Sequence, residues 1–275
     1  MSAIEEKKYL TDKYATSERM TAADLRMITA LLRSPDGCPW DREQTHKSLK
    51  KSLMEECAEL MDAIEAEDDC GMREEMGDLL MNIALQAVIA EERGAFTFRD
   101  VVHDIAEKMI RRHPHVFGSE HVDSSSEVVG LWEKVKKEEK KDRNSVLDGI
   151  AYHCPALLQA EKIQKRVSKY GFDWSDRHRI VDKIQEELDE VKAALASGDE
   201  AHTDEELGDL LFATANLTRF RKRASAEELL ARANRKFADR FRYIETHLAA
   251  QGKTLEESSL AEMDALWNEA KKAGL

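Results

Sequence analysis

The 275-residue sequence predicts an all-α fold made of two tandem, related helical-bundle domains, each with an acidic helical hairpin. Turn-forming residues are few, with 4 prolines and 12 glycines, which favours helices over strands. Apolar residues recur at the three- and four-residue spacing of a helix face. An acidic motif also occurs twice, 131 positions apart, and such a fixed offset indicates a duplicated domain.

The composition excludes several classes of protein. A net charge of -13 argues against non-specific nucleic-acid binding, which needs a basic surface. Residues 1–20 are mostly charged or polar, and no long apolar run suggests a signal region or a membrane span. The four cysteines form no CxxC pair, so we expect no disulfide framework and a cytoplasmic location.

The repeat consists of two short acidic motifs in each half. The first half reads EECAE at 55–59 and EMGDLL at 75–80, and the second half reads EELDE at 186–190 and ELGDLL at 206–211. Glu56 and Glu75 are 19 positions apart, as are Glu187 and Glu206. From this repeat we predict an N-terminal extension over 1–20, a first domain over 21–136, a linker over 137–155 and a second domain over 156–275.

Each acidic pair falls on a predicted helical hairpin. In the first half we expect helices over about 46–66 and 72–92 with a turn at 68–71, because the apolar residues there keep helical spacing. In the second half we expect helices over about 177–196 and 203–223 with a break at 197–199. Antiparallel arms would bring four or five carboxylates together in each hairpin.

Clustered carboxylates on one helix face predict a cation. Like charges at this spacing destabilise an isolated helix by about 0.2–0.5 kcal/mol per pair, so a repeated cluster indicates a compensating ion. Oxygen ligands without His or Cys favour Mg²⁺, or Mn²⁺ as a substitute, over zinc. Gly77 and Gly208 occupy matching mid-helix positions, which suggests close approach of backbone or ligand.

The pattern EExxE, a spacer and ExxD resembles the signature of the all-α nucleotide pyrophosphohydrolases. Further segments make the chain similar to two-domain members of the MazG family: GCPWD at 37–41, RRHPHVF at 111–117, KIQKR at 162–166, GFDW at 171–174 and GDLLFAT at 208–214. The resemblance implies Mg²⁺-dependent hydrolysis of nucleoside triphosphates to monophosphate and pyrophosphate. It also implies a broad base range, a homodimer and a mainly catalytic C-terminal half.

The resemblance also implies roles for individual residues. The implied metal ligands are Glu56, Glu59, Glu75 and Asp78 in the first half and Glu187, Glu190, Glu206 and Asp209 in the second. The implied phosphate- or base-contacting residues repeat at four-residue spacing, as Lys108, Arg112, Trp132 and Lys136, then Lys236, Arg240, Trp267 and Lys271. Glu186, with Glu55 at the matching position, borders each cluster and is the candidate general base.

Other interpretations of single residues stay open at this point. Thr203 to Glu206 fits a capping box, which would give Glu206 a structural role, although we favour the ligand role. The sequence His113-Pro114-His115 suggests zinc, but we favour a polar turn at a helix end. We expect Cys57 in a core.

Other functions also stay open. A di-iron bundle would need Glu-x-x-His pairs, which are missing here. A regulatory nucleotide-binding module without turnover, or an enzyme specific for a noncanonical nucleotide, dUTP or dCTP, would keep the same carboxylates.

Overall fold

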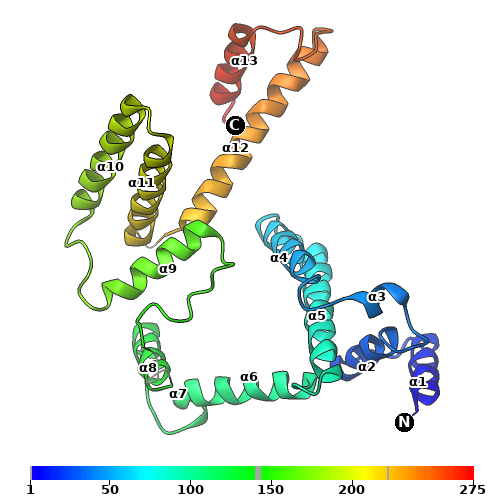
Figure 1. The fold of residues 1–275 in the computed structure, drawn as a ribbon. Coiled ribbons are helices and arrows are strands. Elements are labelled where there is room, and N and C mark those ends of the chain that lie inside the picture. The colour runs from blue at the N-terminus through cyan, green and yellow to red at the C-terminus, as the bar shows by residue number, and fades with distance from the viewer. Residues whose placement is uncertain (1, 140–143, 222) are drawn as a thin grey trace. The chain divides into compact units, whose positions relative to one another are not determined.

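The computed structural model describes residues 2–139, 144–221 and 223–275, and confirms the all-α fold. Within these ranges every regular element is a helix, from α1 to α13. The chain divides into two compact units, residues 1–140 and 141–275, which are described separately (Figure 1). No helix of the described residues has the length and apolar content needed to cross a membrane.

The N-terminal unit contains eight of these helices: α1 (Ala3–Ala15), α2 (Ala22–Leu32), α3 (Pro39–Glu43), α4 (Lys50–Glu65), α5 (Asp69–Glu92), α6 (Phe98–Arg112), α7 (Pro114–Phe117) and α8 (Ser125–Glu138). Helix α1 is held to α2 by a buried ion pair, in which Lys13 Nζ lies 2.9 Å from Asp24 Oδ2. Helix α2 is joined to α5 by ion pairs of Arg26 with Glu91 and of Arg33 with Glu92.

The hairpin of the N-terminal unit consists of α4 and α5, as the sequence predicts (Figure 1). The turn is shorter than expected because the Asp68 side chain accepts a hydrogen bond from the Cys70 amide, 3.0 Å away, and so caps α5. At the other end of the hairpin, Leu49, Leu85 and Ile89 form a small core with Met81 beside them. The acidic motifs therefore lie away from this core, on the facing arms.

The described residues of the C-terminal unit form the other five helices: α9 (Ala156–Ser168), α10 (Arg177–Ser197), α11 (Glu200–Arg221), α12 (Ala226–Ala250) and α13 (Leu260–Lys272). Gly198 ends α10 in a left-handed conformation with φ of 75°, a backbone state that glycine adopts without strain. The α10–α11 hairpin is thus confirmed. A second core lies between α12 and α13, around Ile244, Leu248 and Leu266.

The structure contradicts the expected burial of Cys57 and decides two alternatives that the sequence left open. Helix α11 begins at Glu200, so Thr203 lies inside it and its hydroxyl donates to the Asp199 carbonyl, 2.9 Å away, instead of capping a helix that contains Glu206. Cys57 is exposed because the α4 face that carries it is not covered within the unit. No described protein atom would come within 4 Å of a Cβ at Gly77 or Gly208, which excludes the close backbone approach and leaves room for a ligand.

Candidate metal centres

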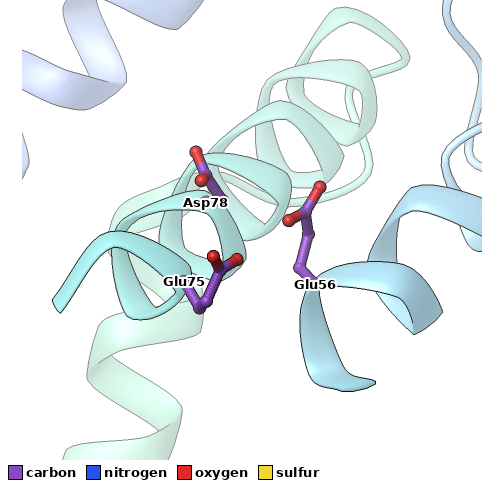
Figure 2. Close-up of side chains that lie close together, drawn as sticks. All are labelled: Glu56, Glu75 and Asp78. Carbon is purple, nitrogen blue, oxygen red and sulfur yellow. The ribbon is translucent and has the colours of Figure 1, made fainter. Parts of the chain in front are cut away.

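In the N-terminal unit, three carboxylates from the two arms of the hairpin come together. Glu56 on α4 and Glu75 and Asp78 on α5 each offer an oxygen within 4.8 Å of the others (Figure 2). Glu59 is not in this group, although its charge acts on Glu75. Three oxygen donors from two packed helices are an arrangement that a hard divalent cation accepts.

Of these carboxylates, Glu75 has the environment that most clearly favours a bound cation. Its Oε2 is buried, and among the described residues it has no hydrogen-bond partner. Burial, and then the charges of Glu59, Glu56 and Asp78, raise the pKa of this carboxyl. An unpartnered oxygen among negative charges is suited to coordinate a cation.

In the C-terminal unit the matching group consists of Glu187 and Glu190 on α10 and Glu206 on α11, again within 4.8 Å. Burial, and then the hydrogen bond and charge of Glu187, raise the pKa of Glu190. In this unit the ammonium group of Lys183 already pairs with the carboxylates, since Lys183 Nζ lies 2.7 Å from Glu187 Oε1. Asp209 does not belong to the group and instead lines the neighbouring cavity.

This cavity has a volume of about 500 Å³ and adjoins the second carboxylate group. Its walls are largely apolar, and the aromatic residues among them are Phe172, Trp174 and Phe212. Its few charged or polar residues include Lys183, Glu187, Asp209, Asn216 and Arg219. Apolar walls with a few convergent polar groups are typical of small-molecule sites. The charged end of the cavity coincides with the candidate metal ligands.

The N-terminal unit fills the matching positions with core side chains. Leu85 stands where the C-terminal unit has Asn216, and Met81 stands where it has Phe212. Leu85 is buried in the core cluster with Leu49 and Ile89. The two units therefore share the carboxylates and differ in the space beside them.

Comparison with known proteins identifies the family. The family model described as "MazG nucleotide pyrophosphohydrolase domain" matches residues 44–117 and 176–244, so each match contains one carboxylate group. The chain is 45% identical over 249 residues to "Nucleoside triphosphate pyrophosphohydrolase/pyrophosphatase MazG" of Thermotoga maritima, covering 90% of this chain and 94% of that protein. It is 44% identical over 254 residues to "Nucleoside triphosphate pyrophosphohydrolase" of Escherichia coli K12, covering 90% and 96%. The chain belongs to the MazG family.

The substrate-binding residues implied by the MazG resemblance lie apart from the cavity of the C-terminal unit. Lys236, Arg240 and Lys271 line a separate basic pocket of about 670 Å³ formed by α12 and α13. Trp267 packs against Phe237, with ring centroids 5.0 Å apart, and the Arg240 guanidinium lies 5.3 Å from its ring centre. None of the four lines the 500 Å³ cavity.

The corresponding residues of the first MazG domain lie on α6 and α8. Arg112 pairs with Glu139, 2.6 Å away, and its guanidinium lies 5.5 Å from the Trp132 ring centre. Lys108 is half-buried on the same helix as Arg112, and the side chain of Lys136 lies outside the described part of the structure.

The candidate bases lie beside the two carboxylate groups. Glu186 is exposed and accepts a hydrogen bond from Lys183, 2.7 Å away, and Glu55 is exposed and pairs with Lys51 at 3.2 Å. Neither His113 nor His115 belongs to a three-ligand group in the described residues, and His113 caps α6.

Sequence reasoning missed Lys183, Asn216 and Arg219, which line the cavity. The position of Lys183, four residues before Glu187, was the available clue, since such a pair shares a helix face.

Proposed function

We propose that this chain hydrolyses nucleoside triphosphates to nucleoside monophosphate and pyrophosphate in a reaction that depends on Mg²⁺ or Mn²⁺. The observation that carries the proposal is the convergence of three carboxylates at each of the two places where the family model matches. The relatives named as nucleoside triphosphate pyrophosphohydrolases extend over nearly the whole chain, which supports the same reaction here.

The carboxylates of each group would hold the metal, joined by Glu59 in the first unit and Asp209 in the second. A bound divalent cation would neutralise phosphate charge as water cleaves the anhydride linkage between the α- and β-phosphates and pyrophosphate leaves. Glu186 would take the proton of the attacking water, since it borders the group and is open to solvent. Lys183 donates hydrogen bonds to Glu186 and Glu187, which raise the pKa of its ammonium group, so it would stay positively charged beside the carboxylates.

The cavity of the C-terminal unit would take the nucleoside. Phe172, Trp174 and Phe212 offer aromatic surface to a flat base, and stacking tolerates every base because each has a π-face. Asn216 and Arg219 are the polar groups available to the base or sugar. A broad base range fits this lining, because few groups in it read hydrogen-bonding edges.

A homodimer and a cytoplasmic location complete the proposal. Both hairpins expose apolar side chains that a second copy would cover, namely Met54, Met61, Met76, Leu80 and Ile83 on α4 and α5, and Leu195, Leu207 and Leu211 on α10 and α11.

Pyrophosphate release from a panel of nucleoside triphosphates, with and without Mg²⁺, tests the proposal on the intact chain and on Asp78→Asn and Asp209→Asn variants. We expect metal-dependent formation of monophosphate and pyrophosphate, strongly reduced in Asp209→Asn. Nucleotide binding without turnover of any substrate would overturn the proposal and favour a regulatory module.

A further inference from the structure

The two carboxylate groups differ at one position that touches them directly. Lys183 and Ser52 occupy equivalent places, each four residues before the first glutamate of its group, Glu187 or Glu56. On a helix this spacing places the side chain over the carboxylate. The duplication has therefore left a cation in one group and a hydroxyl in the other.

In the C-terminal unit, Lys183 is placed as a counter-ion. Its ammonium lies 2.7 Å from Glu187 Oε1 and 2.7 Å from Glu186 Oε1. The Glu187 side chain is only 7% exposed, so water screens this pair poorly. A metal ion that binds Glu187 must displace the ammonium or accept a second positive charge beside it.

In the N-terminal unit, neutral groups occupy the same place. The Ser52 hydroxyl donates to Glu56 Oε1 at 3.3 Å and accepts from Asn82 Nδ2 at 3.1 Å. Among the described residues, no Lys or Arg nitrogen forms an ion pair with Glu56, Glu75 or Asp78. The neighbouring Lys51 pairs instead with the exposed Glu55. The buried Glu75 Oε2 consequently keeps an unfilled acceptor position.

We propose that the N-terminal group binds a divalent cation without nucleotide, whereas Lys183 holds the C-terminal group in a charge-compensated form that takes up its cation only together with the nucleotide. The inference rests on the proposed function, because it assumes that both groups are metal sites. It assigns Lys183 as a positioning residue that sets the order of loading. The nucleotide shifts the balance because its phosphates add negative charge where metal and ammonium compete.

Mn²⁺ binding to the intact, nucleotide-free chain tests the proposal through the EPR signal of free Mn²⁺, which does not depend on turnover. We expect one tight site per chain, lost in Glu75→Gln and kept in Glu206→Gln. A non-hydrolysable α,β-methylene nucleoside triphosphate should raise the tight stoichiometry to two. Equal affinity of both sites without nucleotide would overturn the proposal.

Reciprocal substitutions isolate the lysine. Lys183→Ser should create a second tight site without nucleotide, and Ser52→Lys should weaken the first by at least about tenfold, because a unit charge is added within reach of the metal. Lys192→Ser is the matched control, since Lys192 pairs with Asp189 on the exposed face of α10 and should leave both sites unchanged. Circular dichroism of each variant verifies the helices, and a folded Lys183→Ser with no gain in affinity contradicts the proposal.

Activity assays separate the two proposals. Turnover of nucleoside triphosphates together with two equal metal sites would leave the proposed function intact and refute the order of loading. Unequal sites in a chain that turns over no nucleotide would refute the proposed function alone.

Discussion

Replacing Glu206 with glutamine removes one charge from the C-terminal carboxylate group with little change of shape. The Glu206 side chain is 13% exposed, and its carboxylate oxygen is within 4.8 Å of those of Glu187 and Glu190. It lies inside α11, and its ion-pair partner among the described residues is His202, 3.5 Å away. The substitution should therefore leave the helix in place and weaken only the hold on the metal.

The expected loss follows from the role of a direct ligand. Removing a group that merely orients a ligand costs about 10–100-fold in affinity or activity. A direct ligand should cost at least about 100-fold in kcat/KM, equivalent to about 2.7 kcal/mol of transition-state stabilisation. The assay is pyrophosphate release from a nucleoside triphosphate at saturating Mg²⁺, with far-UV circular dichroism of the same sample.

The neighbouring glutamate provides the control. Glu205 is 76% exposed on the same turn of α11, so Glu205→Gln should keep kcat/KM within about twofold. A Glu206→Gln variant with full turnover would refute the assignment of this group as a metal centre. An equal loss in both variants would show that helix charge, and not ligation, controls the rate.

Three further predictions concern stability. Burial and neighbouring carboxylates raise the pKa of Glu75 above its usual 4.5, so the folded state loses stability as the pH rises past 4.5. Without metal, the Glu75→Gln variant should therefore have a higher Tm than the wild type at pH 7, and this difference should vanish near pH 4.5. The Lys253 hydrogen bond and the Ser259 cap lower the pKa of Glu262 to about 2, so Glu262→Gln should lower the Tm at pH 7, with a gap that narrows from pH 4.5 towards 2; a gap independent of pH would contradict this. Leu248→Ala should lower the free energy of unfolding by about 2–5 kcal/mol in urea titrations, whereas Leu260→Ala, on a residue that is 80% exposed, should change it by less than about 0.5 kcal/mol.

The hairpins and their carboxylates were predictable from sequence because they depend on local rules. Helical spacing of apolar residues places α4, α5, α10 and α11, and a fixed offset of 131 matches the halves. Carboxylates at i and i+3 or i+4 share a face in any helix, so the convergence of Glu187, Glu190 and Glu206 needs only that the arms pack antiparallel.

The surroundings of the carboxylates could not be predicted, because they depend on which helix lies against which. The cavity forms because α9 and the segment around Trp174 lie beside α10 and α11. The spacing of apolar residues along the sequence does not predict how these helices pack against one another. The exposure of Cys57 has the same origin, because a spacing pattern marks a helix face as apolar without saying whether anything covers it. The separation of Lys236 and Arg240 from the cavity likewise depends on where α12 and α13 lie.

Two differences between the halves, at the positions of Asn216 and Lys183, both concern the surroundings of the carboxylate groups. Both units keep their carboxylates, yet the N-terminal unit has Leu85 in a core where the C-terminal unit has Asn216 in a cavity. The N-terminal unit also lacks the lysine that compensates the other group, with Ser52 in its place. Lys183 compensates the buried charge of the C-terminal group before metal and nucleotide arrive, whereas the N-terminal group has the Ser52 hydroxyl in that place. These two differences are the ones expected if, as proposed, the N-terminal group binds its cation without nucleotide and the C-terminal group binds its cation together with the nucleotide.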